Sequence, residues 1–433
     1  MTQLTDKPTR NENILDLTLT TNTDLISNLD VIPGISDHQA VSFGIETQAR
    51  RQKKPERHVY QYRKANTEGL LSDMAAFQET FLNSDPLNNT VEENWNTFKS
   101  TLTETMNRHI PQKKITSRWN LAWITPGIRR MIRQKKRAWK SGKHNKESKG
   151  WKRFLVLEKE VKEAIQKAHR SYIDNILDGA VKDNPKKFYS YIKQKRSGVS
   201  SIPVLKTNNS TISESDQKAE ALNKQYTSVF TNEPNDTLPT MDGQPTPDMP
   251  PVYFTSRGIE KLLQGLNTSK ASGPDLIPTR VLKMVAAEVA PILSVIFQQS
   301  YDTGQVPTDW LQANVTAVFK KGDKTVPSNY RPVSLTCILC KTMEHILFSQ
   351  IMRHLDSHNV LVNYQHGFRK NHSCETQLLA TMEELSRNLD QRKTTDLLIL
   401  DFSKAFDTVP HRRLLHKLNH YGVTGRTNRW ISS

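Results

Sequence analysis

The sequence predicts a mixed α/β (α+β) chain of several parts, on three observations. Short runs of alternating apolar and polar residues near the N-terminus indicate strands, and long apolar-periodic stretches further on indicate helices. A strongly basic segment lies between these regions. A length of 433 residues also favours two or three domains. We expect four parts, at residues 1–46, 47–196, 197–255 and 256–433.

Composition indicates an intracellular protein with an anionic partner. Three cysteines and the absence of a membrane-length apolar run favour a soluble protein of a reducing compartment, and residues 1–13 lack the apolar core of a signal peptide. The net charge of +17 is concentrated in residues 113–196, which carry 25 Lys and Arg against 7 Asp and Glu. Nucleic acid is the natural partner, although a solvated helical face of lysines would have the same composition.

Two short runs near the N-terminus, residues 14–19 and 40–45, have the alternation of half-buried strands. The loop between them carries Asp37 and His38. An imidazole at the start of a strand suits phosphate chemistry when a second carboxylate fixes its tautomer. A turn with an incidental histidine is the alternative.

Helices are expected through the basic part. Residues 91–110 are one candidate, and apolar residues that recur at spacings of three to seven between positions 151 and 176 predict an amphipathic helix. Tryptophans at positions 119, 123, 139 and 151 could stack on bases, but core packing is the favoured use. Residues 197–255 are turn-rich and then proline-rich, as in a mobile linker or surface loop.

The C-terminal part begins with a turn signal at residues 273–275, followed by a periodic helical stretch at 277–301. A second amphipathic helix, at 335–352, includes Cys337 and Cys340. No second cysteine pair exists, so core packing is favoured over a zinc site.

A strand at 313–319 and a returning limb at 328–335 predict a hairpin. Lys320 and Lys321 follow the strand, and Arg331 lies on the returning limb. Such a hairpin can clamp a polyphosphate, the arginine bidentately and the lysines as point charges. A surface hairpin with solvated charge is the alternative.

An apolar run at 395–400 has strand length and delivers Asp401 to its end. A single carboxylate at a strand tip suits a hard cation with oxygen ligands, and a turn aspartate is the alternative. Residues 400–411, Leu-Asp-Phe-Ser-Lys-Ala-Phe-Asp-Thr-Val-Pro-His, resemble the first palm motif of reverse transcriptases of non-LTR (LINE-type) retrotransposons. The resemblance implies that Asp401 binds two catalytic Mg²⁺ ions and that Phe406 packs under the sugar of the incoming dNTP. We interpret Asp407 as a residue that caps the turn.

Other motifs extend the resemblance. Residues 329–335 match the fingers motif whose arginine contacts the triphosphate, which implies that role for Arg331, together with Lys320 or Lys321. Residues 184–192 are similar to the region just before the polymerase.

Template contacts follow from two further matches. Residues 365–373 resemble a motif that lies along the template strand, which implies nucleic-acid contacts for Arg369 and Lys370, and residues 270–275 resemble the start of the fingers, which implies one for Lys270. The implied partners are an RNA template and a DNA target or primer, with no membrane, in the nucleus and cytoplasm.

The N-terminal residues resemble the last two motifs of the apurinic-endonuclease-like domain that precedes the reverse transcriptase in these elements. The resemblance implies that His38 acts at the scissile phosphate, that Asp16 orients it and that Asp37 lies by the metal. It covers only about the last 45 residues of that domain, so we expect no DNA cleavage by this piece.

The resemblance implies a partial right-hand polymerase, fingers plus an incomplete palm, at 256–433. A largely helical basic linker at 47–196 and a short remnant of an endonuclease β-sandwich at 1–46 precede it. The family supplies further metal carboxylates from a downstream Asp-Asp hairpin, but this sequence contains no Asp-Asp dipeptide. We therefore expect an RNA-directed DNA polymerase by family that is inactive as this truncated chain. A basic nucleic-acid-binding remnant without chemistry is the alternative.

Overall fold

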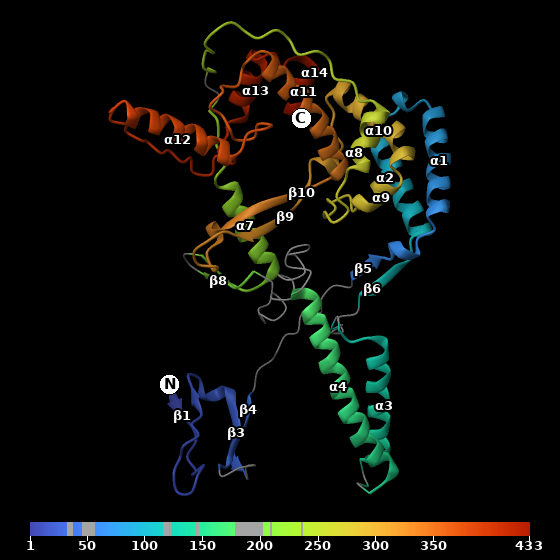
Figure 1. Ribbon diagram of the computed structural model, residues 1–433, viewed down its shortest axis with the longest axis vertical. Helices are drawn as coiled ribbons and strands as arrows, with labels where there is room; N and C mark the ends of the chain where they lie inside the picture. Colours follow the sequence, from blue (N-terminus) through green and yellow to red (C-terminus); the bar gives the residue numbers. More distant parts are fainter. Residues whose placement is uncertain are drawn as a thin grey trace. The chain divides into compact units, whose positions relative to one another are not determined.

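The structure is a computed structural model that describes residues 1–32, 38–45, 57–115, 121, 123–143, 145, 147–177, 202–207, 210–234 and 237–433. Two compact units are present, Met1–Val59 with Lys114–Thr116, and Tyr60–Lys113 with Ser117–Ser433. Helices and two-stranded sheets are mixed along the chain, as predicted (Figure 1). In the described ranges, no helix combines the length and apolarity needed to cross a membrane.

The first unit contains two antiparallel ladders, β1 (Thr2–Gln3) with β2 (Leu19–Thr20) and β3 (Ile26–Ile32) with β4 (Ala40–Ile45). The strand predicted at 40–45 is confirmed. The one predicted at 14–19 is wrong except at its end, because the backbone N–H groups of Leu15 and Asp16 donate to Thr9 Oγ1 instead of to a neighbouring strand. β5 (Arg57–Tyr60) and β6 (Gln112–Ile115) form a further ladder.

Two helices follow, α1 (Thr67–Asn83) and α2 (Val91–His109). A reciprocal capping box begins α2, in which Thr90 Oγ1 accepts from the Glu93 N–H at 3.2 Å and the Glu93 carboxylate accepts from the Thr90 N–H at 2.8 Å. The helix predicted at 91–110 is therefore confirmed.

The main core joins these helices to α8 (Ser256–Gln264), α9 (Thr279–Met284), α10 (Ala286–Thr303) and α11 (Ile338–Ser357). The Trp310 ring lies 5.3 Å from that of Trp95 on α2 and 5.7 Å from that of Phe297 on α10, between ring centroids. Asn94 donates to Gln299 at 2.9 Å. The segment assigned to a basic linker thus begins with two helices that share a core with the C-terminal helices, which lie beside them in Figure 1.

The cysteines of α11 pack in this core. Cys337 and Cys340 are free and buried, and the Cys337 thiol donates to the Asp275 carboxylate at 2.8 Å. Burial raises the pKa of both thiols and also that of the Asp275 carboxyl. The preference for core packing over a zinc site is confirmed by this burial.

A smaller cluster surrounds the hairpin of β9 (Ala313–Phe319) and β10 (Tyr330–Thr336), which confirms the predicted hairpin. β7 (Leu205–Thr207), β8 (Ser210–Ile212) and α7 (Ser215–Thr227) accompany it. Leu205, Leu222 and Tyr330 form its buried centre.

Two long helices, α3 (Pro126–Gly142) and α4 (Lys149–Leu177), form a helical hairpin (Figure 1). The amphipathic helix predicted at 151–176 is confirmed as part of α4. Trp123 packs on it, with ring centroids 4.6 Å from His169 and 5.4 Å from Tyr172, as expected for a packing tryptophan. Trp119 and residues 184–192 lie outside the described residues.

The C-terminal segment contains α12 (Cys374–Asp390), α13 (His411–His420) and α14 (Gly425–Ser432). The strand predicted at 395–400 is wrong, because strands require a pairing partner and none of the described ladders includes these residues. Its apolar side chains are exposed, as are several on α12.

The proline-rich residues 231–249 form neither helix nor strand where they are described, but they are held against the C-terminal segment. Thr231 donates to the Thr408 carbonyl at 2.7 Å, and the Met249 N–H donates to the Gly422 carbonyl at 2.8 Å. This part of the predicted linker is therefore anchored at both ends.

Candidate functional site

One cavity of about 720 Å³ brings together four of the predicted site residues. Lys320 and Arg331 line it from the β9–β10 hairpin, and Asp401 and Phe406 line it from the turn at 401–407. Its other lining residues are Gln225, Tyr226, Val229, Ser328, Tyr330, Pro332, Phe402, Ser403, Lys404, Ala405 and Asp407.

The hairpin fixes the cationic side of the cavity. Arg331 pairs with Val318 in the ladder, and the Lys320 N–H donates to the Asn329 carbonyl at 2.8 Å, which closes the end of the hairpin. Gly322 has φ +88°, a backbone conformation that a side chain would strain, so the turn requires this glycine. Among the described residues neither cation has an ion-pair partner, so both are available to an anion. Lys321 does not line the cavity.

A compact turn presents the other side. The Asp407 N–H donates to the Lys404 carbonyl at 2.9 Å, and Lys404 has φ +51°. The Phe406 ring meets that of Phe368 edge-on, with centroids 5.7 Å apart. Phe406 is 76% exposed, so its face is open to a ligand in the cavity.

The carboxylates of the cavity are Asp401 and Asp407. In the part of the chain that the structure describes, no three His, Cys, Asp or Glu side chains come together as a metal site. Two-metal phosphoryl transfer needs several carboxylates to hold both ions. The described residues of the cavity therefore do not complete a two-ion site.

The hydrogen bond expected between His38 and Asp16 in the N-terminal unit is present. His38 Nδ1 lies 2.9 Å from Asp16 Oδ2, and this hydrogen bond, with one from Thr9, holds the pKa of Asp16 below its usual value. Asp37 lies outside the described residues.

The predicted template-contact residues are not among those that line the 720 Å³ cavity. Lys270 lines a second cavity of about 840 Å³ between α8, β10 and α11. The Arg369 guanidinium is engaged within the chain, donating to the Val362 carbonyl at 2.9 Å and to Asp356 at 3.4 Å. Lys370 is exposed.

Comparison with known families identifies the C-terminal segment. Residues 318–433 match the family "Reverse transcriptase (RNA-dependent DNA polymerase)". These residues are a reverse transcriptase domain. The match includes every predicted site residue from Lys320 onward and leaves out Lys270 and the His38–Asp16 pair.

Individual relatives point to the same family. The chain is 28% identical over 170 residues to "RNA-directed DNA polymerase from mobile element jockey" of Drosophila melanogaster, which is 39% of this chain and 19% of the relative. It is 26% identical over 172 residues to "Probable RNA-directed DNA polymerase from transposon X-element" of the same organism, 40% of this chain and 19% of the relative. A type-1 retrotransposable element R2 polyprotein of Popillia japonica is 30% identical over 129 residues, 30% of this chain and 18% of the relative.

The predicted kinship with reverse transcriptases of non-LTR retrotransposons is confirmed by these matches. The matched region spans about a fifth of the length of these curated relatives.

Sequence reasoning missed the contribution to the 720 Å³ cavity of Gln225 and Tyr226 on α7 and of Val229 just after the helix. Leu222 and Tyr226, four residues apart, are the apolar signal that could have identified this helix. Phe368, which contacts Phe406, was also missed. Its exposure and φ of +61° mark a turn residue whose ring is displayed, not packed in a core.

Proposed function

We propose that the 720 Å³ cavity binds the incoming dNTP of an RNA-directed DNA polymerase. The observation that carries this proposal is the meeting of Lys320 and Arg331 with Asp401 and Phe406 in one cavity, although 70 residues separate Arg331 from Asp401 along the chain. Two cations without ion-pair partners among the described residues, together with an exposed ring and a carboxylate in the same cavity, suit a nucleotide with a triphosphate tail.

Each residue has a distinct part in this proposal. Arg331 presents a planar fork that can bind two phosphate oxygens, and Lys320 adds a point charge. Phe406 provides an apolar surface for the sugar. Asp401 would meet the metal-bound end of the triphosphate.

Reverse transcriptases generally use divalent metal ions and dNTPs, and we propose Mg²⁺ for this site. When bound, the ions would stabilise the negative charge on the transferring phosphoryl group. Asp401 would contribute one ligand, because Mg²⁺ is commonly held by one or two carboxylates together with substrate phosphates.

We also propose roles for the other parts of the chain. Residues 256–433 would be the fingers and part of the palm, and residues 1–46 a remnant of an endonuclease-like domain in which His38 and Asp16 keep their pairing. The nucleic-acid partners would be an RNA template and a DNA primer, bound in part by the basic residues 113–196. We place this activity in the nucleus and cytoplasm.

A second candidate function is nucleic-acid binding without chemistry. The small number of carboxylates at the cavity favours it for the 433-residue chain by itself.

Primer extension on an RNA template separates the two functions. We expect no extension by the 433-residue chain, and Mg²⁺-dependent extension once it is joined to the Asp-Asp hairpin segment of a relative. In that joined protein Asp401→Asn should lower extension by more than about a hundredfold, because it removes a direct metal ligand. Asp396→Asn, five residues away and outside the cavity, is the matched control. Extension by the 433-residue chain that is lost on Asp401→Asn would contradict this account of the site.

A further inference from the structure

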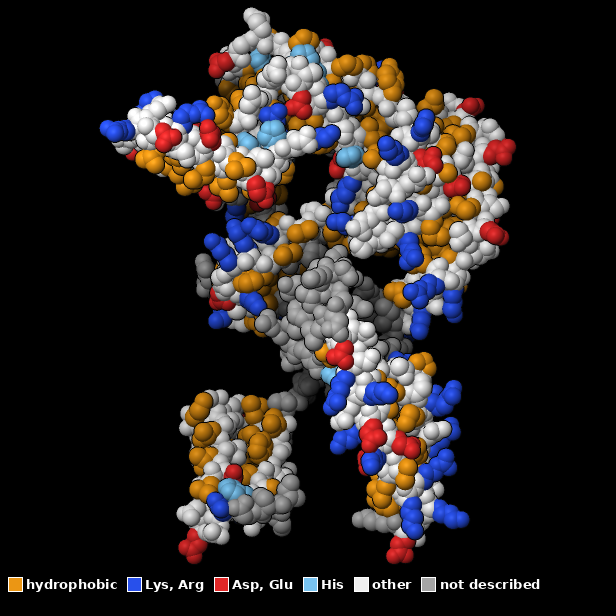
Figure 2. Space-filling view, viewed as in Figure 1, with side chains coloured by type: hydrophobic (Ala, Val, Ile, Leu, Met, Phe, Trp, Pro, Cys, Tyr) orange, Lys and Arg blue, Asp and Glu red, His pale blue; other side chains and the backbone are white. Residues whose placement is uncertain are grey.

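The positive charge of the α3–α4 hairpin is not shared equally by its helices. α3 and α4 each carry seven Lys and Arg, but α3 has no acidic residue and α4 has four. In Figure 2 Lys and Arg side chains gather along the outer edge of this hairpin. The structure thus singles out α3 within the basic segment.

Six of the α3 cations lie on one face, within an arc of about 120° at 3.6 residues per turn. We call them the α3 basic stripe, and they are Arg129, Arg130, Arg133, Lys136, Arg137 and Lys140. All six are exposed. The stripe spans eleven residue steps, or about 16 Å of helix.

The opposite face of α3 is occupied by α4. Ile128 and Ala138 are buried, and Gly142 approaches Trp151 so closely that a Cβ would collide with the Trp151 backbone. Lys135, the seventh cation, also turns toward α4, where it forms an ion pair with Glu158 at 2.9 Å and lies 5.6 Å from the Phe154 ring. Packing between the helices therefore fixes which face of α3 is displayed.

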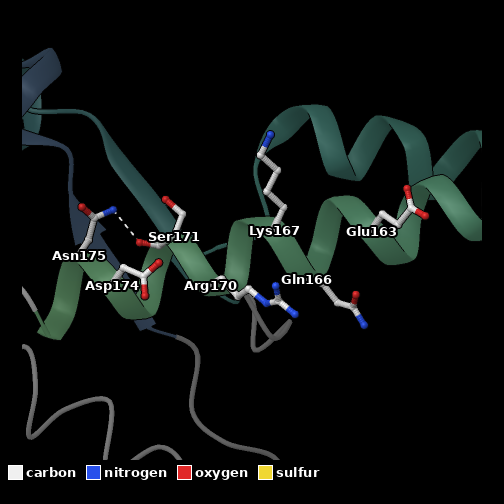
Figure 3. A pocket seen from close by; sticks show the side chains of 7 residues that line it. All are labelled: Glu163, Gln166, Lys167, Arg170, Ser171, Asp174 and Asn175. Atoms are coloured by element: carbon white, nitrogen blue, oxygen red, sulfur yellow. Dashed lines mark hydrogen bonds between the residues drawn. The ribbon is translucent and has the colours of Figure 1, made fainter.

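Repulsion among the like charges of the α3 basic stripe destabilises the isolated α3–α4 hairpin. Like charges three and four residues apart on a helix repel each other, and five of the six residues, all except Arg129, have no ion-pair partner among the described residues. A bound polyanion would remove this repulsion. α4 differs, because Figure 3 shows Glu163 and Asp174 interspersed with Lys167 and Arg170 along its open surface.

We propose that the α3 basic stripe binds the sugar-phosphate backbone of a nucleic-acid duplex. The proposal rests on the nucleic-acid partner of the proposed function and names its surface and form. A straight, rigid row of cations matches a stiff duplex, which presents one charge per about 1.7 Å of axis, better than a flexible single strand that must first be ordered. Four of the six residues are arginines, which bind phosphate in a forked geometry.

The duplex is favoured over an anionic membrane because of the apolar face. A helix that lies on a membrane must insert its apolar side into the lipid. In α3 Ile128 and Ala138 of that side are buried in the described structure.

The test measures duplex binding against salt concentration. A variant of the 433-residue chain would carry five Gln substitutions, at Arg130, Arg133, Lys136, Arg137 and Lys140. Its matched control would carry five on α4, at Lys152, Arg153, Lys159, Lys162 and Lys167, which are also exposed. Binding to a 20-base-pair DNA duplex and an RNA duplex of the same sequence would be followed between about 50 and 200 mM salt.

We expect the α3 variant to reduce the slope of log K against log salt by about 4.5, since each of five phosphate contacts contributes about 0.9. The α4 control should change the slope by less than about 1. Helical content, measured by circular dichroism, should be equal in all three proteins. The arms with DNA and RNA duplexes show which duplex is preferred.

Several outcomes would overturn the inference. An unchanged slope in the α3 variant, an equal loss in the α4 control, or tighter binding of a single strand than of the duplex would each refute it while leaving the nucleic-acid partner in place. Stronger α3-dependent binding to phosphatidylserine vesicles than to duplex would assign the stripe to a membrane. Failure of the parent chain to bind any nucleic acid would instead refute the proposed partner itself.

Discussion

Replacing Trp95 by alanine tests whether α2 is part of the C-terminal core. The Trp95 side chain is fully buried, its ring meets Trp310 edge-on, and its indole N–H donates to Asp309 at 2.9 Å. Burial of about 200 Å² of aromatic surface corresponds to about 5 kcal/mol, and large-to-small changes of this kind typically cost about 3–5 kcal/mol. Asp309 keeps its contact with Lys99, so the lost hydrogen bond adds little.

The assay is hydrogen exchange read by mass spectrometry on peptides of α10, Ala286–Thr303. A loss of about 3 kcal/mol accelerates exchange through the shared opening by more than about a hundredfold. Trp139→Ala is the control, because Trp139 is 42% exposed on α3 and lies outside this core. Unchanged exchange in α10, with faster exchange confined to α1 and α2, would refute the shared core and support an independent linker.

Three further predictions follow from single side chains. Burial raises the pKa of Asp275, so its contribution to the stability of the fold is full below the ordinary carboxyl pKa and is lost as the pH rises through the raised value. Asp275→Asn should therefore flatten the fall in the urea midpoint as the pH rises above about 4, and an unchanged profile would contradict this reasoning. The hydrogen bond from His38 lowers the pKa of Asp16, so His38→Ala should raise that pKa in a carboxyl NMR titration, and no upward shift would show that the pair is not formed in solution. In the protein that joins this chain to the Asp-Asp hairpin segment of a relative, Arg331→Ala should raise KM for dNTP more than it lowers kcat. Lys321→Ala is the control, because Lys321 is a nearby cation that does not line the cavity. Equal effects of the two changes would argue against a phosphate role for Arg331.

Local signals were enough to predict several elements. The helix predicted at 91–110 corresponds to α2, where the structure adds a capping box at Thr90 and Glu93, and the periodic apolar residues of 151–176 define most of α4. The β9–β10 hairpin follows from two neighbouring apolar runs and a turn with Gly322. In each case the residues that decide the structure lie within one turn or one hairpin of each other.

Long-range packing could not be predicted in the same way. The capping and apolar pattern of α2 show that it is a helix, but they do not show that Trp310, 215 residues further on, packs against Trp95. The contribution of α7 to the cavity was missed for the same reason. A strand at 395–400 fits its residues locally, yet a strand forms only where a second strand accepts its hydrogen bonds.

The two sides of the cavity therefore differ in how firmly they are built. Arg331 lies on a paired strand, in register with Val318, so the proposed phosphate-binding side is held by a ladder. Asp401 follows residues that belong to no described ladder, and Leu398 and Ile399 are about 80% exposed. Catalytic groups must be held within about 0.5 Å of their productive positions. A paired strand achieves this precision, and an unpaired segment does not. Pairing of residues 396–400 with another strand would bury these side chains and fix Asp401 at the same time. We infer that the proposed triphosphate binding and the alignment of Asp401 depend on different parts of the structure, and that the alignment requires residues 396–400 to pair with a strand.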